Sequence, residues 1–131
     1  MEIRVGAGYR TVDDINEMIA LMSAEFARST ALDHLVIAAD WRQCRVLTPE
    51  VAERAVLMLS RSNPRVKRSA ILHAREQSTS VLQVMRLARE AKLPHRRVFT
   101  ETAEMRGWLE PVLNAEELAR LDLLLRAPTS A

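Results

Sequence analysis

The segment that decides the fold reads Leu35-Val36-Ile37-Ala38-Ala39-Asp40, an unbroken apolar run that ends in an acid. A continuous run of this kind is typical of a strand buried on both faces, as in a parallel sheet. Parallel strands need crossover connections, which are usually helices, so helix and strand are expected to alternate on either side. The segment therefore predicts the central strand of an α/β fold.

Helix signals flank this strand on both sides. Upstream, Thr11 and Asp14 form a capping-box pattern, and apolar residues follow it at spacings of three and four through Phe26. Downstream, Thr48-Pro49-Glu50 combines a cap, a first-turn proline and an early acid, and Asn63-Pro64 ends the pattern. Two helices are therefore predicted to pack against the strand.

The alternation continues to the end of the chain. Further strands are predicted at residues 3–5, 68–73 and 96–99, with a glycine-containing break at 6–8. Ser78 or Thr79 is expected to cap one helix, and Thr100 the next. Asn114 with Glu117 opens a last helix.

The length of 131 residues suits a single domain. The expected architecture is a four- to five-stranded, mostly parallel sheet flanked by helices, with a helical C-terminal extension. Residues 1–113 form the α/β domain, and 114–126 form a helix packed on it or at a dimer interface. Residues 127–131 are expected to be a tail.

Composition excludes several protein classes. No apolar run reaches the roughly 18 residues that a membrane span needs, and the start does not resemble a signal peptide. The single Cys44 cannot form an internal disulfide, so a cytoplasmic location is expected. The three histidines show no metal-ligand spacing, and the usual nucleotide and hydrolase motifs are absent from the sequence, so neither a cofactor nor an enzyme is expected.

Charge is distributed unevenly along the chain. The segment 61–97 contains ten basic and two acidic residues, a net charge of +8, while the remainder carries −6. This segment could meet nucleic acid, an acidic protein or a membrane surface, or could form a solvated, salt-bridged exterior. Aromatic residues make up only 4% of the chain, which argues against stacking on single-stranded nucleic acid.

Two positions are candidate ligand sites. Asp40 follows the central strand, at the sheet edge where α/β folds bind ligands, and Arg42 and Arg45 lie in the next loop. They form either a pocket for a polar ligand or a loop cap with solvated arginines. Arg75 and Ser78 precede a helix, where they either bind an anion or simply cap the helix.

The last helix is a candidate interface. Leu118, Leu121 and Leu125 share one face, which either docks on the domain's own sheet or joins two copies in a homodimer.

Several short motifs together resemble the SpoIIAA-like branch of the STAS fold, which is named for sulfate transporters and anti-sigma-factor antagonists. They are Gly8-x-x-Thr11-x-x-Asp14, Leu35 through Asp40, Arg68-Ser69-Ala70-Ile71-Leu72, and Arg97-Val98-Phe99 followed by Trp108-Leu109. The resemblance covers most of residues 2–113. It implies a bacterial interaction module, because family members act as phosphorylation-switched partners of anti-sigma kinases.

The family's phosphorylated serine follows an aspartate at a helix start, whereas here that helix begins Leu47-Thr48-Pro49-Glu50. Thr48 therefore either replaces the phosphoacceptor or acts as an N-cap. The sequence thus predicts a non-enzymatic regulatory or scaffold module that binds a protein partner. The alternatives are a small-molecule or lipid carrier, which related domains imply, and an anionic-polymer binder that uses segment 61–97.

Overall fold

The computed structural model describes residues 2–4, 9, 11–28 and 35–126. The elements run in the order β1 (Glu2–Arg4), α1 (Val12–Arg28), β2 (Leu35–Asp40), α2 (Pro49–Ser62), η1 (Asn63–Arg65), β3 (Val66–Leu72), α3 (Ser78–Glu90), β4 (Arg96–Phe99), α4 (Thr102–Leu109), η2 (Glu110–Val112) and α5 (Ala115–Arg126). The predicted break at 6–8 and the predicted tail at 127–131 lie outside the described residues.

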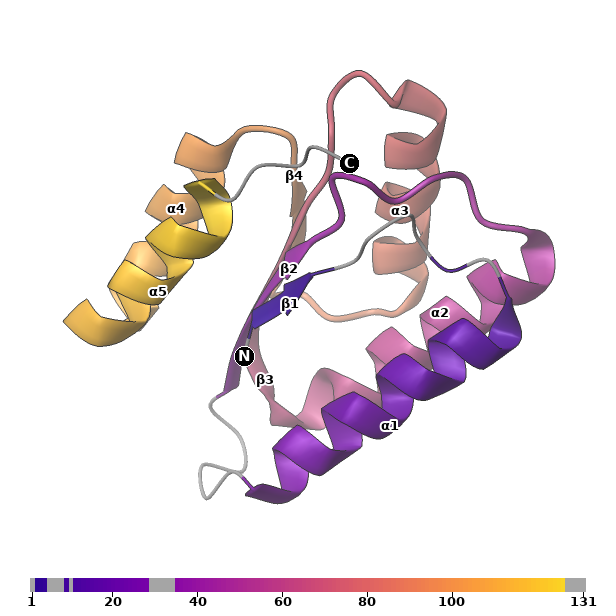
Figure 1. Ribbon diagram of the computed structural model, residues 1–131, viewed down its shortest axis with the longest axis horizontal. Helices are drawn as coiled ribbons and strands as arrows, with labels where there is room; N and C mark the ends of the chain where they lie inside the picture. Colours follow the sequence, from indigo (N-terminus) through magenta and orange to yellow (C-terminus); the bar gives the residue numbers. More distant parts are fainter. Residues whose placement is uncertain (1, 5–8, 10, 29–34, 127–131) are drawn as a thin grey trace.

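The sheet is parallel and its strands lie in the spatial order β1-β2-β3-β4. Right-handed crossovers between consecutive parallel neighbours place the connecting helices on one face. Figure 1 shows α1, α2 and α3 together on one side of the sheet and α4 and α5 on the other. The predicted α/β class, with helices flanking a parallel sheet, is confirmed.

Side chains that alternate along β2 and β3 divide the interior into two cores. Ile37 and Ile71 belong to the core under α1–α3, whereas Ala38 and Leu72 belong to the core under α4–α5. Because successive residues of a strand point to opposite faces, both faces of β2 need apolar residues. This requirement explains the unbroken apolar run in the sequence.

Three predicted helix starts are confirmed. The backbone N–H of Thr11 donates to Asp14 and that of Asp14 donates to Thr11 Oγ1, at 3.2 and 3.3 Å. Asn114 and Glu117 exchange the same two bonds at 2.9 and 2.8 Å. Thr48 Oγ1 accepts from the N–H of Val51 at the start of α2. In each case a polar side chain satisfies an amide that the helix itself leaves unpaired.

Two predicted caps are wrong. The N-cap of α3 is Gln77 rather than Ser78 or Thr79, and the N-cap of α4 is Glu101 rather than Thr100; neither residue makes a side-chain cap bond. Near each of these helix starts a polar side chain instead contacts a residue that is distant in the sequence. Ser80, in the first turn of α3, bonds to a distant loop, and Glu101 forms an ion pair with Arg75.

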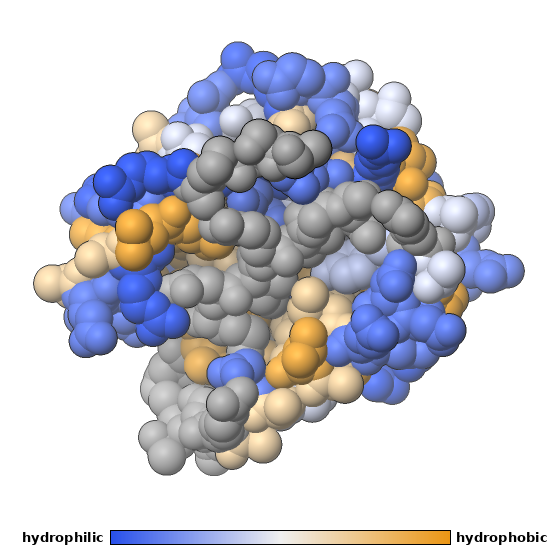
Figure 2. Space-filling view, viewed as in Figure 1, coloured by the Kyte–Doolittle hydropathy of each residue, from blue (hydrophilic) through white to orange (hydrophobic). Residues whose placement is uncertain are grey.

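The last helix packs on its own domain. Leu121 and Leu124 are buried against Ala38, Ala70 and Leu72, and Leu118 and Leu125 are partly buried beside them. Leu123 points away and is 62% exposed. On the face seen in Figure 2, hydrophobic residues form separate patches over the α4–α5 pair and along α1, bordered by hydrophilic residues.

Candidate functional site

Asp40 and Arg42 form a clamp between the end of β2 and the last turn of α5. Nε and Nη2 of Arg42 both donate to the Asp40 carboxylate at 2.9 Å, and the backbone N–H of Arg42 donates to it at 3.1 Å. The same guanidinium donates to the carbonyls of Leu124 and Leu125 at 3.3 Å. The hydrogen bond to Asp40 raises the pKa of Arg42, although burial opposes this effect.

The clamp is a structural feature. A bidentate arginine–carboxylate pair is among the stronger polar contacts. A cation at a helix C-terminus also interacts favourably with the negative end of the helix dipole. Asp40 accepts a loop amide, as one of the two sequence interpretations expected, but Arg42 is bonded rather than solvated. The pair therefore holds α5 against the sheet.

The other predicted site residues lie elsewhere on the surface. Arg45 is exposed in the loop before α2, and Thr48 caps that helix. Arg75, in the β3–α3 turn, pairs with Glu101 at the N-cap of α4, and Ser78 is the exposed first residue of α3. The structure thus brings Asp40 and Arg42 together and leaves the others as separate surface positions.

A buried polar network was not foreseen from the sequence. Ser80 Oγ donates to the carbonyl of Cys44 at 3.1 Å and accepts from His73 Nε2 at 2.9 Å. His73 and Ser80 are each 1% exposed, and Cys44 is fully buried. The network joins the end of β3, the first turn of α3 and the loop after β2, three segments that the chain separates by up to 36 residues.

Ser80 and His73 lie as close together as a catalytic nucleophile and its base, but solvent cannot reach them. A substrate atom must come within about 3.5 Å of a nucleophile, which the 1% exposure of Ser80 prevents. Burial also raises the pKa of the Cys44 thiol to about 11, so it is protonated at neutral pH. The network is thus a buried link between three segments, closed to solvent.

The network makes stability depend on pH. Burial lowers the pKa of His73, and the Ala74 carbonyl, 3.3 Å from Nδ1, partly opposes this effect. The folded protein then binds this proton less readily than the unfolded chain, so the contribution of neutral His73 is complete above about pH 6.5 and is lost as pH falls below that value.

We expect the wild-type free energy of unfolding to fall from pH 7 to pH 5 more steeply than that of His73→Gln. The difference is at most about 1.4 kcal/mol per pH unit, the limit for one group. Urea denaturation at several pH values measures it. Parallel curves for the two proteins would show that His73 does not titrate in this range.

The basic residues of segment 61–97 are spread over several surfaces. The guanidinium carbons of Arg68 and Arg97 lie 5.0 and 5.3 Å from the Trp108 ring centroid, on the α4 side of the sheet. Arg86 pairs with Glu90 along α3, at 3.1 Å. Arg75 pairs at the β3–α3 turn. One sequence segment therefore supplies charge to different faces.

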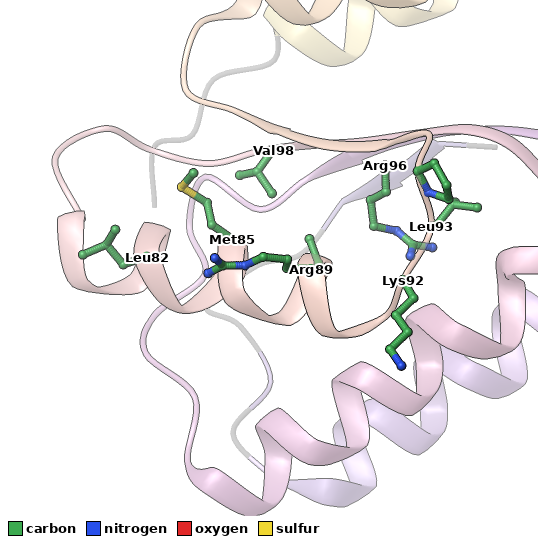
Figure 3. Close-up of a pocket in the computed structure, with 9 residues that line it drawn as sticks. Leu82, Met85, Arg89, Lys92, Leu93, Arg96 and Val98 are labelled. Atoms are coloured by element: carbon green, nitrogen blue, oxygen red, sulfur yellow. The ribbon is translucent and has the colours of Figure 1, made fainter.

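A groove of about 680 Å³ runs between α3 and β4 (Figure 3). Its walls come from the outer face of α3, from β4 and from the turn between them. The lining residues are Leu82, Met85, Ala88, Arg89, Lys92, Leu93, Pro94, Arg96 and Val98. In Figure 3, Leu82, Met85 and Val98 gather at one end, Arg96 and Lys92 lie at the other, and the Arg89 side chain extends toward Met85.

The groove combines exposed apolar side chains with positive charge. Leu82 is 67% exposed and Met85 is 47% exposed, although both stand on a helix with a buried opposite face. Arg89, Lys92 and Arg96 all line the groove, and none of the lining residues is acidic. The groove is therefore complementary to a ligand that has both an apolar part and a negative charge.

Arg96 anchors the basic end of the groove. Its side chain is almost wholly buried, and it donates to the carbonyl of Leu59 at 3.1 Å and to Ser69 Oγ at 3.4 Å. Burial lowers its pKa to about 10, so it stays charged at neutral pH. Lys92 at the same end has a φ of 56°, a left-handed conformation that favours glycine. A charged side chain thus occupies a strained position in the groove rim.

Comparisons with protein-family models, with curated proteins and with solved structures each find no match. The described residues contain no group of three or more histidine, cysteine, aspartate or glutamate side chains that could hold a metal ion. Within the same residues, no helix has the length and apolar character to cross a membrane.

Proposed function

We propose that this chain is a non-catalytic protein-interaction module whose partner-binding surface is the α3–β4 groove. The observation that carries the proposal is the coincidence of a sheet edge with an open groove that has apolar and basic walls. A groove between an edge strand and a helix is a recurring binding place for extended segments of partner proteins. The resemblance to the STAS family, which stays a prediction, implies the same class of function.

The shape of the interior supports partner binding over a carrier function. A carrier needs a largely enclosed apolar cavity of several hundred Å³. The space beneath Tyr9 and Trp41 holds only about 20 Å³, which is room for about one water molecule. The larger α3–β4 groove is open to solvent and suits a ligand that remains attached to a larger molecule.

The placement of charge supports a protein partner over an anionic polymer. A polymer binder needs a continuous basic face along which phosphates can lie. Here Arg68 and Arg97 stack on Trp108, while Arg89 and Lys92 lie on the α3 side. The groove itself mixes cations with leucine, methionine and valine, a combination that suits a polypeptide.

Selection from a random peptide display library on the immobilised protein tests the proposal. Enriched peptides should bind at least about tenfold more weakly to Leu82→Asp, because a carboxylate would then stand in the apolar end of the groove. Leu123→Asp is the matched control, since Leu123 is equally exposed on α5 but lies outside the groove. Equal loss in both variants, or no enriched peptide, would refute the proposal.

A further inference from the structure

We infer that the ligand of the groove is an extended acidic segment of a partner protein, which adds to β4 as a further strand and sets a carboxylate against Arg89. This inference rests on the proposed function and specifies the partner's chemistry. Four observations carry it: the orientation of the β4 backbone, the length of the groove, its charge and the order of its side chains.

The backbone of β4 offers hydrogen bonds on its outer side. The carbonyls of His95 and Phe99 accept from the backbone N–H groups of Ser69 in β3 and of His73 just after it, at 2.9 and 2.8 Å. In a parallel ladder alternate residues of a strand face the same neighbour, so the N–H and C=O of Val98 face away from β3. Because β4 is the last strand in the sheet order, an added strand can pair with these groups.

The groove has the length of a short strand. Leu82 and Lys92 are ten residues apart along the α3 wall, which corresponds to about 15 Å at 1.5 Å per residue. An extended chain advances about 3.3 Å per residue, so about five residues of a partner span the groove. This length matches the four residues of β4.

The order of side chains along the groove specifies a short pattern. Arg96 and Val98 both face α3, because Arg97 and Phe99 face Trp108 on the other side of the sheet. An added strand likewise places every second side chain in the groove. Met85 and Arg89 are four residues apart on α3, about 6 Å, so an acid opposite Arg89 and an aliphatic residue opposite Met85 are about two strand positions apart.

Charge argues against a second copy of this chain as the occupant. Pairing β4 of two copies would bring Arg97, Arg89 and Lys92 of each chain toward those of the other. Like charges brought together across an interface repel, whereas a carboxylate there gains a charge-assisted contact. The basic edge therefore discourages self-association and selects an acidic partner.

The experiment uses acetylated and amidated hexapeptides and ¹⁵N-labelled full-length protein. Gly-Asp-Thr-Leu-Thr-Gly and the reversed order Gly-Thr-Leu-Thr-Asp-Gly should shift the amide signals of Val98 and Arg89, and the better binder reports the strand direction. Replacing Asp by Asn should weaken binding about tenfold or more. The Val98 amide proton should become protected from exchange when the peptide binds.

Single N-methylation along the better peptide tests strand addition. Methyl groups on alternate amides should weaken binding about two- to tenfold each, while those between should not, because only alternate amides face β4. Arg89→Ala should remove the preference for Asp over Asn, whereas Lys67→Ala, an exposed cation outside the groove, should keep it.

The outcomes separate the two proposals. Library peptides that bind the groove without acidic residues, or without sensitivity to N-methylation, overturn the acidic-strand inference and leave the proposed function standing. Loss of groove binding by every peptide overturns both. A concentration-dependent dimer that protects Val98, or oleate that shifts the groove signals while the peptides do not, would identify a different occupant and also overturn the inference.

Discussion

The Arg42→Ala variant is expected to lose about 3 kcal/mol of unfolding free energy, which is a large part of the stability of an ordinary domain. The substitution leaves the Asp40 carboxylate, whose side chain is 6% exposed, without the guanidinium that now bonds to it twice. It also removes the donor to the carbonyls of Leu124 and Leu125. The cost arises mainly from stranding a buried charge.

Urea denaturation measures this loss, and two variants provide controls. Arg86→Ala removes an ion pair in which both side chains are about half exposed or more, so it should cost less than about 1 kcal/mol. Arg42→Lys keeps the charge but cannot form the bidentate contact, so its unfolding free energy should lie between those of Arg42→Ala and Arg86→Ala. If Arg42→Ala costs no more than Arg86→Ala, the clamp does not hold α5 in place.

The Leu121→Ala variant is expected to lose a similar amount, about 3 kcal/mol, while the oligomeric state stays unchanged. Leu121 is 2% exposed and packs among Ala38, Ala70 and Leu72 on the sheet face that α4 and α5 cover. Truncating a fully buried leucine removes its apolar contacts and leaves a cavity that the surrounding structure only partly fills.

Leu123→Ala is the matched control, because Leu123 lies on the same helix but is 62% exposed. It should change stability by less than about 0.5 kcal/mol. Sedimentation velocity of all three proteins tests the dimer interpretation of this helix directly. If Leu121→Ala dissociates an oligomer without lowering the stability of the monomer, then the apolar stripe is an interface and not an internal contact.

Much of the fold was predictable from short-range patterns. The apolar run at 35–40 marks β2, and the capping boxes at Thr11 and Asn114 mark the starts of α1 and α5. These signals depend on contacts within one turn of helix or on burial of both strand faces, and both are written in adjacent residues. The caps predicted at Ser78 or Thr79 and at Thr100 were wrong, because α3 begins after Gln77 and α4 begins after Glu101, and neither of these residues makes a side-chain cap bond.

The candidate site was much less predictable. Sequence reasoning singled out Asp40 and Arg42 as a polar ligand site, and the structure shows them bonded to each other and to α5. Sequence reasoning gave the net charge of segment 61–97 but could not predict which face of the domain each basic residue lies on. The groove was missed, although the spacing of Leu82, Met85, Arg89 and Lys92 along one side of α3 was a readable signal.

The strand at 35–40, from which the fold was first read, shows where the two kinds of information separate. The sequence alone determined that this segment is a strand buried on both faces, because burial on both faces requires consecutive apolar residues. Only the tertiary structure decided what its terminal Asp40 does, since Asp40 holds Arg42, and Arg42 in turn bonds to carbonyls of a helix more than 80 residues away. The groove was likewise decided by the tertiary structure. It exists because β4 is the last strand of the sheet and lies beside α3.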